Sequence, residues 1–236
     1  MADRRDLFSI TKIVKRVALG FIFLGLSVAF GDDPVTQWIN VVEKNKGVTV
    51  LIRVDTEGQD SGFGSGVIIG PGRVLTAKHV LPDDPTRERG NFLIKGLVGW
   101  DEASIDFAQA RKLVIEYVSV RYDLAILRFE SGTSTEPHAF STGSLKQGQS
   151  ILVMGYPDGG SLTCTQGIVS NKNAGGTWGT DATVGVGNSG GPLFDPNGSL
   201  VGILLEGSAG RDGKARSFWD ISWVLMQLAR NCPPPR

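Results

Sequence analysis

Short runs of β-branched and apolar residues, each broken by glycine or another turn residue, constrain the fold of this chain most strongly. Glycine supplies 32 of the 236 residues, roughly twice its usual share of about 7%. The runs form two series, at residues 48–54, 66–69, 74–76, 92–98, 113–118 and 124–129, and at residues 150–155, 162–170, 192–194 and 200–205. No helix-length segments alternate with these runs, which argues against a parallel α/β sheet.

Two sets of about six strands predict an all-β fold of two six-stranded antiparallel β-barrels. We expect barrel one at about residues 47–130, a linker at 131–148 and barrel two at 149–221. A short C-terminal helix is predicted at residues 222–230, before a cysteine and three prolines. These parts form one domain over 47–236, and residues 32–46 form a polar lead-in segment.

The first 31 residues have the pattern of an export signal. Lys12, Lys15 and Arg16 precede 14 uncharged residues, 17–30, and small residues then favour a cut before Asp32. An uncleaved signal anchor is the alternative, although a 14-residue helix spans only about 21 Å of a hydrocarbon core about 30 Å thick. Either interpretation places the body outside the cytoplasm, periplasmic or extracellular. Membrane contact is expected only if this segment is retained.

The formal net charge of zero combines a basic leader and a mildly acidic body. Residues 1–31 carry five basic and two acidic groups, so the remainder carries 19 basic and 22 acidic groups. Such a body lacks the basic footprint that nucleic-acid binding needs. The two cysteines and two histidines have no metal-ligand spacing, so we expect no metal and no cofactor. Whether Cys164 and Cys232 form a disulfide stays open.

Three segments carry residues suited to nucleophilic catalysis. Residues 187–192 read Gly-Asn-Ser-Gly-Gly-Pro, which can expose the Ser189 hydroxyl on a tight turn, although an ordinary glycine-rich turn is the alternative. A serine needs a base and an orienting carboxylate to become a good nucleophile. His79 follows a predicted strand, and Asp123 begins another, where a carboxylate costs free energy unless it is paired.

Together these segments resemble the signatures of trypsin-like serine proteases with the chymotrypsin fold. Thr180-Asp181-Ala182 ahead of residues 187–193 is most similar to the bacterial HtrA/Deg branch, and the resemblance covers about residues 47–222. It implies that His79 is the general base and then acid, Asp123 orients the imidazole, and Ser189 is the nucleophile. It also implies an oxyanion hole made by the backbone N–H groups of Gly187 and Ser189.

The sequence departs from its relatives in ways that bear on activation. Digestive enzymes of this class carry Asp where this chain has Asn188, so activation by an ion pair to a new N-terminus is not expected. HtrA relatives usually carry a PDZ domain after the protease, and the 47 residues past Ser189 leave no room for one.

Substrate preference is expected from the same resemblance. The family places the floor of the primary pocket at Thr183, followed by Val184, and a neutral floor disfavours cleavage after Lys or Arg. We therefore expect small to medium apolar residues before the cut. The segment that contains Leu205, Glu206 and Gly207 is expected to pair with the substrate backbone by β-addition.

The sequence therefore predicts an exported serine endopeptidase that hydrolyses polypeptides, unfolded proteins among them, through an acyl-enzyme intermediate. A catalytically silent trypsin-like fold that serves as a binding module is the alternative, and an esterase on the same site is a third reading. The oligomeric state is open, with a trimer implied by the resemblance alone.

Overall fold

The computed structural model describes residues 33–82, 92–99, 106–131, 145–173, 176–205 and 216–231. Within these ranges the chain forms twelve strands, two α-helices and four short 3₁₀ turns. The predicted export segment, Glu206, Gly207, Cys232 and the second histidine of the chain, His138, lie outside the described residues.

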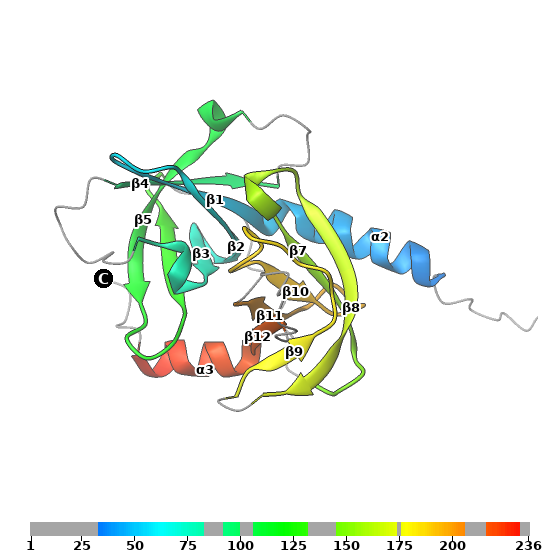
Figure 1. The fold of residues 1–236 in the computed structure, drawn as a ribbon. Helices are drawn as coiled ribbons and strands as arrows, with labels where there is room; N and C mark the ends of the chain where they lie inside the picture. The colour runs from blue at the N-terminus through cyan, green and yellow to red at the C-terminus, as the bar shows by residue number, and fades with distance from the viewer. Residues whose placement is uncertain are drawn as a thin grey trace, which may run out of the picture. The chain divides into compact units, whose positions relative to one another are not determined.

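Barrel one is a closed antiparallel sheet with the strand order β1-β2-β3-β6-β5-β4. It is coloured blue to green in Figure 1. Its strands are β1 (Thr49–Thr56), β2 (Gly62–Gly70), β3 (Arg73–Thr76), β4 (Phe92–Val98), β5 (Arg111–Val118) and β6 (Ala125–Phe129). Apolar side chains that alternate along these strands fill the interior, among them Val50, Ile52, Val67 and Leu127.

Barrel two is a second closed antiparallel sheet with the order β10-β11-β12-β9-β8-β7. It runs from yellow-green to orange in Figure 1. Its strands are β7 (Ser150–Gly155), β8 (Thr163–Lys172), β9 (Trp178–Thr180), β10 (Pro192–Phe194), β11 (Leu200–Leu204) and β12 (Arg216–Asp220). The prediction of two six-stranded antiparallel barrels is confirmed.

Two helices flank the barrels along the chain. The predicted C-terminal helix is confirmed as α3 (Ile221–Asn231), which follows β12 directly. The polar lead-in instead contains a helix, α2 (Pro34–Asn45). Its Lys44 and Asn45 side chains donate hydrogen bonds to the carbonyls of Asn197 and Gly198, at 3.3 and 3.4 Å. These bonds attach α2 to the β10–β11 hairpin of barrel two. None of the described helices combines the length and apolar character of a membrane crossing.

Candidate active site

Strand pairing in barrel one brings His79 and Asp123 together. Strands β3 and β6 are antiparallel with Thr76 opposite Ala125. The residues that follow β3 therefore lie beside those that precede β6. His79 lies in a 3₁₀ turn (Lys78–Val80), and its Nδ1 lies 2.6 Å from Asp123 Oδ2. The His79 backbone N–H donates to the other carboxylate oxygen, Oδ1, at 2.9 Å.

The Asp123 carboxyl is stabilised as a carboxylate. Burial raises its pKa, but hydrogen bonds from the His79 ring and the His79 and Lys78 backbone, with the His79 charge, outweigh burial and lower the pKa below its ordinary value of 3.8. Asp123 is therefore ionised at neutral pH. Both of its oxygens bond to His79, so the carboxylate fixes the orientation of the imidazole ring.

The Ser189 loop packs directly against barrel one. Gly190 has a φ of +81°, and a Cβ placed there would lie 2.2 Å from Thr76 Oγ1 and 2.3 Å from the Ser65 carbonyl oxygen. Only glycine permits both this backbone conformation and this contact. The Ser65 N–H donates to the Ser189 carbonyl at 2.8 Å. The loop is thus held against β2 and β3, and β3 is the strand that leads to His79.

Two amides in this loop are left without an acceptor while their neighbours are bonded. Asn188 N–H donates to Gly185, Gly190 N–H to Leu204, and Gly191 N–H to Asn188. Within the described part of the chain, the Gly187 and Ser189 amides donate to no other group. Backbone amides in a packed loop are nearly always paired, so these two unpaired amides are candidate donors to a bound molecule.

The residues expected to govern specificity lie in different environments. Thr183 is exposed, and its carbonyl accepts a hydrogen bond from Thr165 Oγ1 at 2.6 Å. The Val184 side chain is 3% exposed and that of Leu205 is 7% exposed, and both pack in hydrophobic cores. Of Thr183, Val184 and Leu205, only Thr183 is exposed to solvent.

Three residues around the Ser189 loop were not predicted from the sequence. Ser65 in β2, Tyr156 at the end of β7 and Asp158 in the following 3₁₀ turn (Pro157–Gly159) all bond to that loop or to one another. The one available signal was Gly64-Ser65-Gly66, a serine between two glycines. Its partners are too distant in sequence for local patterns to identify.

Cys164 is half-buried, and burial raises the pKa of its thiol to about 11. It is therefore protonated at neutral pH. Among the described residues no group of three or more His, Cys, Asp or Glu side chains could hold a metal ion.

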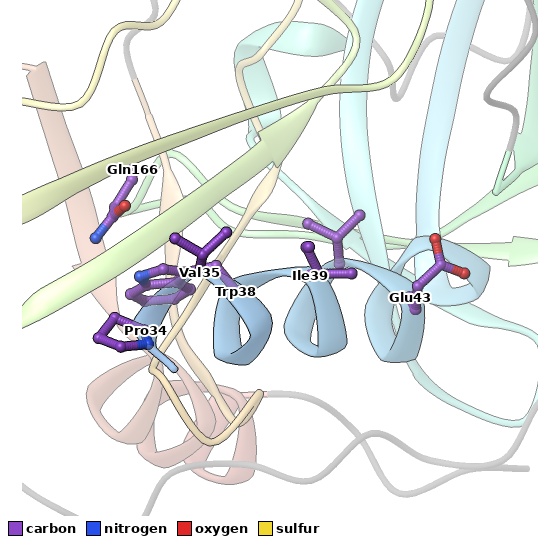
Figure 2. A pocket seen from close by; sticks show the side chains of 7 residues that line it. Pro34, Val35, Trp38, Ile39, Glu43 and Gln166 are labelled. Atoms are coloured by element: carbon purple, nitrogen blue, oxygen red, sulfur yellow. The ribbon is translucent and has the colours of Figure 1, made fainter. Parts of the chain in front are cut away.

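An apolar hollow of about 530 Å³ lies beside α2, away from these residues. Figure 2 shows Trp38 and Ile39 of α2 on one side and Gln166 of β8 on the other. None of the predicted site residues lines it.

The geometry and the fold agree with the comparisons with known proteins. Residues 64–203 match the family model described as a trypsin-like peptidase domain, and the chain belongs to this family.

Individual proteins are similar to this chain in sequence or in fold. A Marinomonas protein described as a probable periplasmic serine endoprotease DegP-like is 34% identical over 157 residues, which cover 62% of this chain and 30% of that protein. The chain thus spans less than a third of that relative's length. The active form of the Rv3671c protease from M. tuberculosis superposes with a TM-score of 0.68 at 25% identity, covering 86% of this chain and 88% of the other. Deg5 gives 0.68 at 25% identity, covering 83% and 94%.

Proposed function

We propose that the protein is a serine endopeptidase with Ser189, His79 and Asp123 as its catalytic triad. The observation that carries the proposal is the double hydrogen bond between His79 and Asp123, next to strands that also hold the Ser189 loop. Membership of the trypsin-like peptidase family supports the same assignment.

The proposed reaction proceeds through an acyl-enzyme. His79 accepts the Ser189 hydroxyl proton as Oγ attacks the substrate carbonyl, and the Gly187 and Ser189 amides hold the resulting oxyanion. Protonated His79 then gives its proton to the leaving amine, and the peptide C–N bond breaks. Water, deprotonated by His79, attacks the ester and releases Ser189 and a carboxylic acid. The Asp123 carboxylate stabilises the imidazolium in both halves.

Digestion of an unfolded polypeptide such as reduced casein tests the endopeptidase assignment. We expect internal cleavage by the wild type and a loss of about 10⁶-fold in kcat in Ser189→Ala. Ser170→Ala, which removes a half-buried hydroxyl in β8, is the matched control and should retain full turnover. Binding of polypeptides without cleavage would favour the silent binding module, and ester turnover alone would favour an esterase.

We propose further that the enzyme prefers small to medium apolar residues before the scissile bond. The exposed, uncharged Thr183 supports this. The backbone of Leu205, which directly follows β11, would pair with the substrate. A peptide-library digest should show such cleavage, and Thr183→Asp should raise cleavage after Lys and Arg. Wild-type preference for Lys or Arg would refute the assignment.

We propose that the protein is exported, with polypeptides as its partners. Residues 1–31 support this, because basic residues are followed by an apolar run and then by small residues. A relative described as periplasmic supports it as well. N-terminal sequencing of the mature protein decides between cleavage before Asp32 and a retained anchor.

A further inference from the structure

The Gly187 N–H, the first donor of the oxyanion hole in the proposed function, is placed by the two peptide units on either side of Gly187. The geometry points to Asp158 and Ser65 as positioning residues that fix these two peptides from opposite barrels. The inference rests on the proposed function and adds the residues that hold its site in the active arrangement.

Asp158 fixes the peptide between Val186 and Gly187. Its backbone N–H donates to the Val186 carbonyl at 2.7 Å. In a planar trans peptide the C=O and the following N–H point in opposite directions. Holding the Val186 oxygen toward Asp158 therefore turns the Gly187 N–H away from it, toward the side where the amide is unpaired. A rotated peptide would place the Val186 oxygen there and remove the donor.

The segment containing Asp158 packs on the back of Gly187. A Cβ placed on Gly187, whose φ is +92°, would lie 2.5 Å from the Tyr156 carbonyl oxygen and 2.8 Å from Asp158 N. The same turn is held from barrel one by Phe63, whose ring lies 2.5 Å from a Cβ built on Gly159. Neither Gly187 nor Gly159 has room for a side chain, so the turn is pressed between the Ser189 loop and β2.

Asp158 adopts a backbone conformation that suits this role. With φ +52° and ψ +23°, it is the one non-glycine residue with positive φ in the described ranges. Asp and Asn tolerate this left-handed region better than other residues that have a Cβ, and such strain persists where the surroundings dictate it. The side chain is exposed, so the backbone amide and the unusual φ are the features that the site uses.

Ser65 fixes the peptide between Gly187 and Asn188. Its buried hydroxyl donates to the Gly187 carbonyl at 2.7 Å and accepts from the Tyr156 N–H at 2.9 Å. The Ser65 N–H also bonds the Ser189 carbonyl, and the Ser65 carbonyl accepts from Thr76 Oγ1 at 2.7 Å. One residue of barrel one thus holds both the Ser189 loop and the segment that leads to Asp158.

A pair of substitutions at residue 158 tests the inference. Asp158→Pro removes the N–H and cannot adopt φ +52°, whereas Asp158→Gly keeps the N–H and adopts this φ freely. We expect Asp158→Pro to lower kcat about 10²-fold, as for loss of an oxyanion donor, with KM within about threefold. Asp158→Gly should stay within about threefold of wild type in both parameters.

Ser65→Ala provides a second test from the other barrel. We expect a fall in kcat of about tenfold or more, together with weaker binding of a peptide boronate that mimics the tetrahedral intermediate. The matched control is Ser61→Ala, which removes a hydroxyl bonded to Asp55 elsewhere in barrel one and should leave both values unchanged. Thermal unfolding of every variant separates loss of fold from loss of positioning.

Equal losses in Asp158→Pro and Asp158→Gly, or no loss in Asp158→Pro and Ser65→Ala, would overturn the positioning role. A folded wild type without turnover would instead refute the proposed function. In that case amide hydrogen exchange tests the positioning role, because it does not depend on turnover. The residue-158 amide should be protected, and Ser65→Ala should accelerate exchange there and at the Asn188 amide, which donates to the Gly185 carbonyl. Unchanged exchange at both amides would overturn it.

Discussion

His79 donates to both oxygens of the Asp123 carboxylate, one from its backbone and one from its ring. This arrangement fixes the position of the residue and the tilt of its imidazole at once. Ser189 is held from the same side, through Ser65 and the close contact of Gly190 with Thr76. The site is therefore organised by barrel one although its proposed nucleophile belongs to barrel two.

Replacing Asp123 by Asn tests the role of this carboxylate. The amide places an NH₂ group toward either the His79 backbone N–H or its ring, so one of the two bonds is lost. With the NH₂ group toward the ring, Nδ1 must accept, which favours the wrong tautomer. We expect kcat to fall by about 10⁴-fold, with a far-ultraviolet spectrum like that of wild type. Asp106→Asn, at an exposed turn of barrel one, should leave kcat unchanged. Near-normal turnover in Asp123→Asn would remove Asp123 from the mechanism.

The flanking patterns at His79, Asp123 and Ser189 were readable from the sequence because each adjoins a strand or a glycine-rich turn. Ser65 was not identified, because its hydroxyl bonds Gly187, which is 122 residues away. Asp158 was not identified either, because its positive φ is set by the packing of Gly187 and Phe63 around its turn. Local sequence patterns cannot predict such long-range contacts.

Among the elements, α3 bears on the site through a cluster of three aromatic rings. Trp219 of β12 and Trp223 of α3 stack with centroids 4.2 Å apart and planes 9° from parallel. Tyr122, which directly precedes Asp123, meets both rings edge-on at 5.8 and 4.6 Å. The C-terminal helix therefore packs against the segment that carries Asp123.

Trp223→Ala should destabilise the protein and disturb the site together. Loss of a half-buried aromatic ring and its two ring contacts is expected to lower the free energy of unfolding by about 2–3 kcal/mol. Because Tyr122 loses a neighbour, kcat should also fall, by about tenfold. Urea unfolding and turnover measure the two effects, and Trp223→Phe should recover most of both. An unchanged unfolding midpoint in Trp223→Ala would contradict the packing described.

Strands with clear β-branched runs were predicted, whereas β9, β12 and α2 were not. β9 has three residues, and β12 pairs with β9 and β11 across long sequence separations. Both exist because barrel closure supplies partners, a condition that propensity does not describe. The helix α2 did carry a signal, since Asp33-Pro34 begins it and apolar residues at 35, 38, 39 and 42 follow helical spacing.

At the scale of the whole molecule, two carboxylates make stability depend on pH. Burial raises the pKa of Asp55, but hydrogen bonds from Ser61 and Arg53 and the charges of Arg53 and Lys95 outweigh it, so its pKa lies below 3.8. Asp123 is lowered as well. In the unfolded chain both groups return to ordinary values and bind protons more readily. Their contribution to stability is therefore present above the unfolded pKa and lost as pH falls through the folded pKa.

We accordingly expect these two groups to leave the free energy of unfolding nearly constant from pH 7 to about 5 and to lower it below about pH 4. Asp55→Asn should make the acid decline shallower without affecting turnover at neutral pH. Urea midpoints across this range provide the measurement. A variant that declines as steeply as wild type would show that Asp55 does not contribute.

The most direct test of the central claim is labelling of the folded protein with a fluorophosphonate, which reacts with activated serines. The account predicts one adduct per chain, located at Ser189 by peptide mass spectrometry. It predicts no adduct in Ser189→Ala and labelling slowed by at least about 10²-fold in His79→Ala. Absence of an adduct in folded wild-type protein, or an adduct on another serine, would contradict the assignment of Ser189 as the nucleophile.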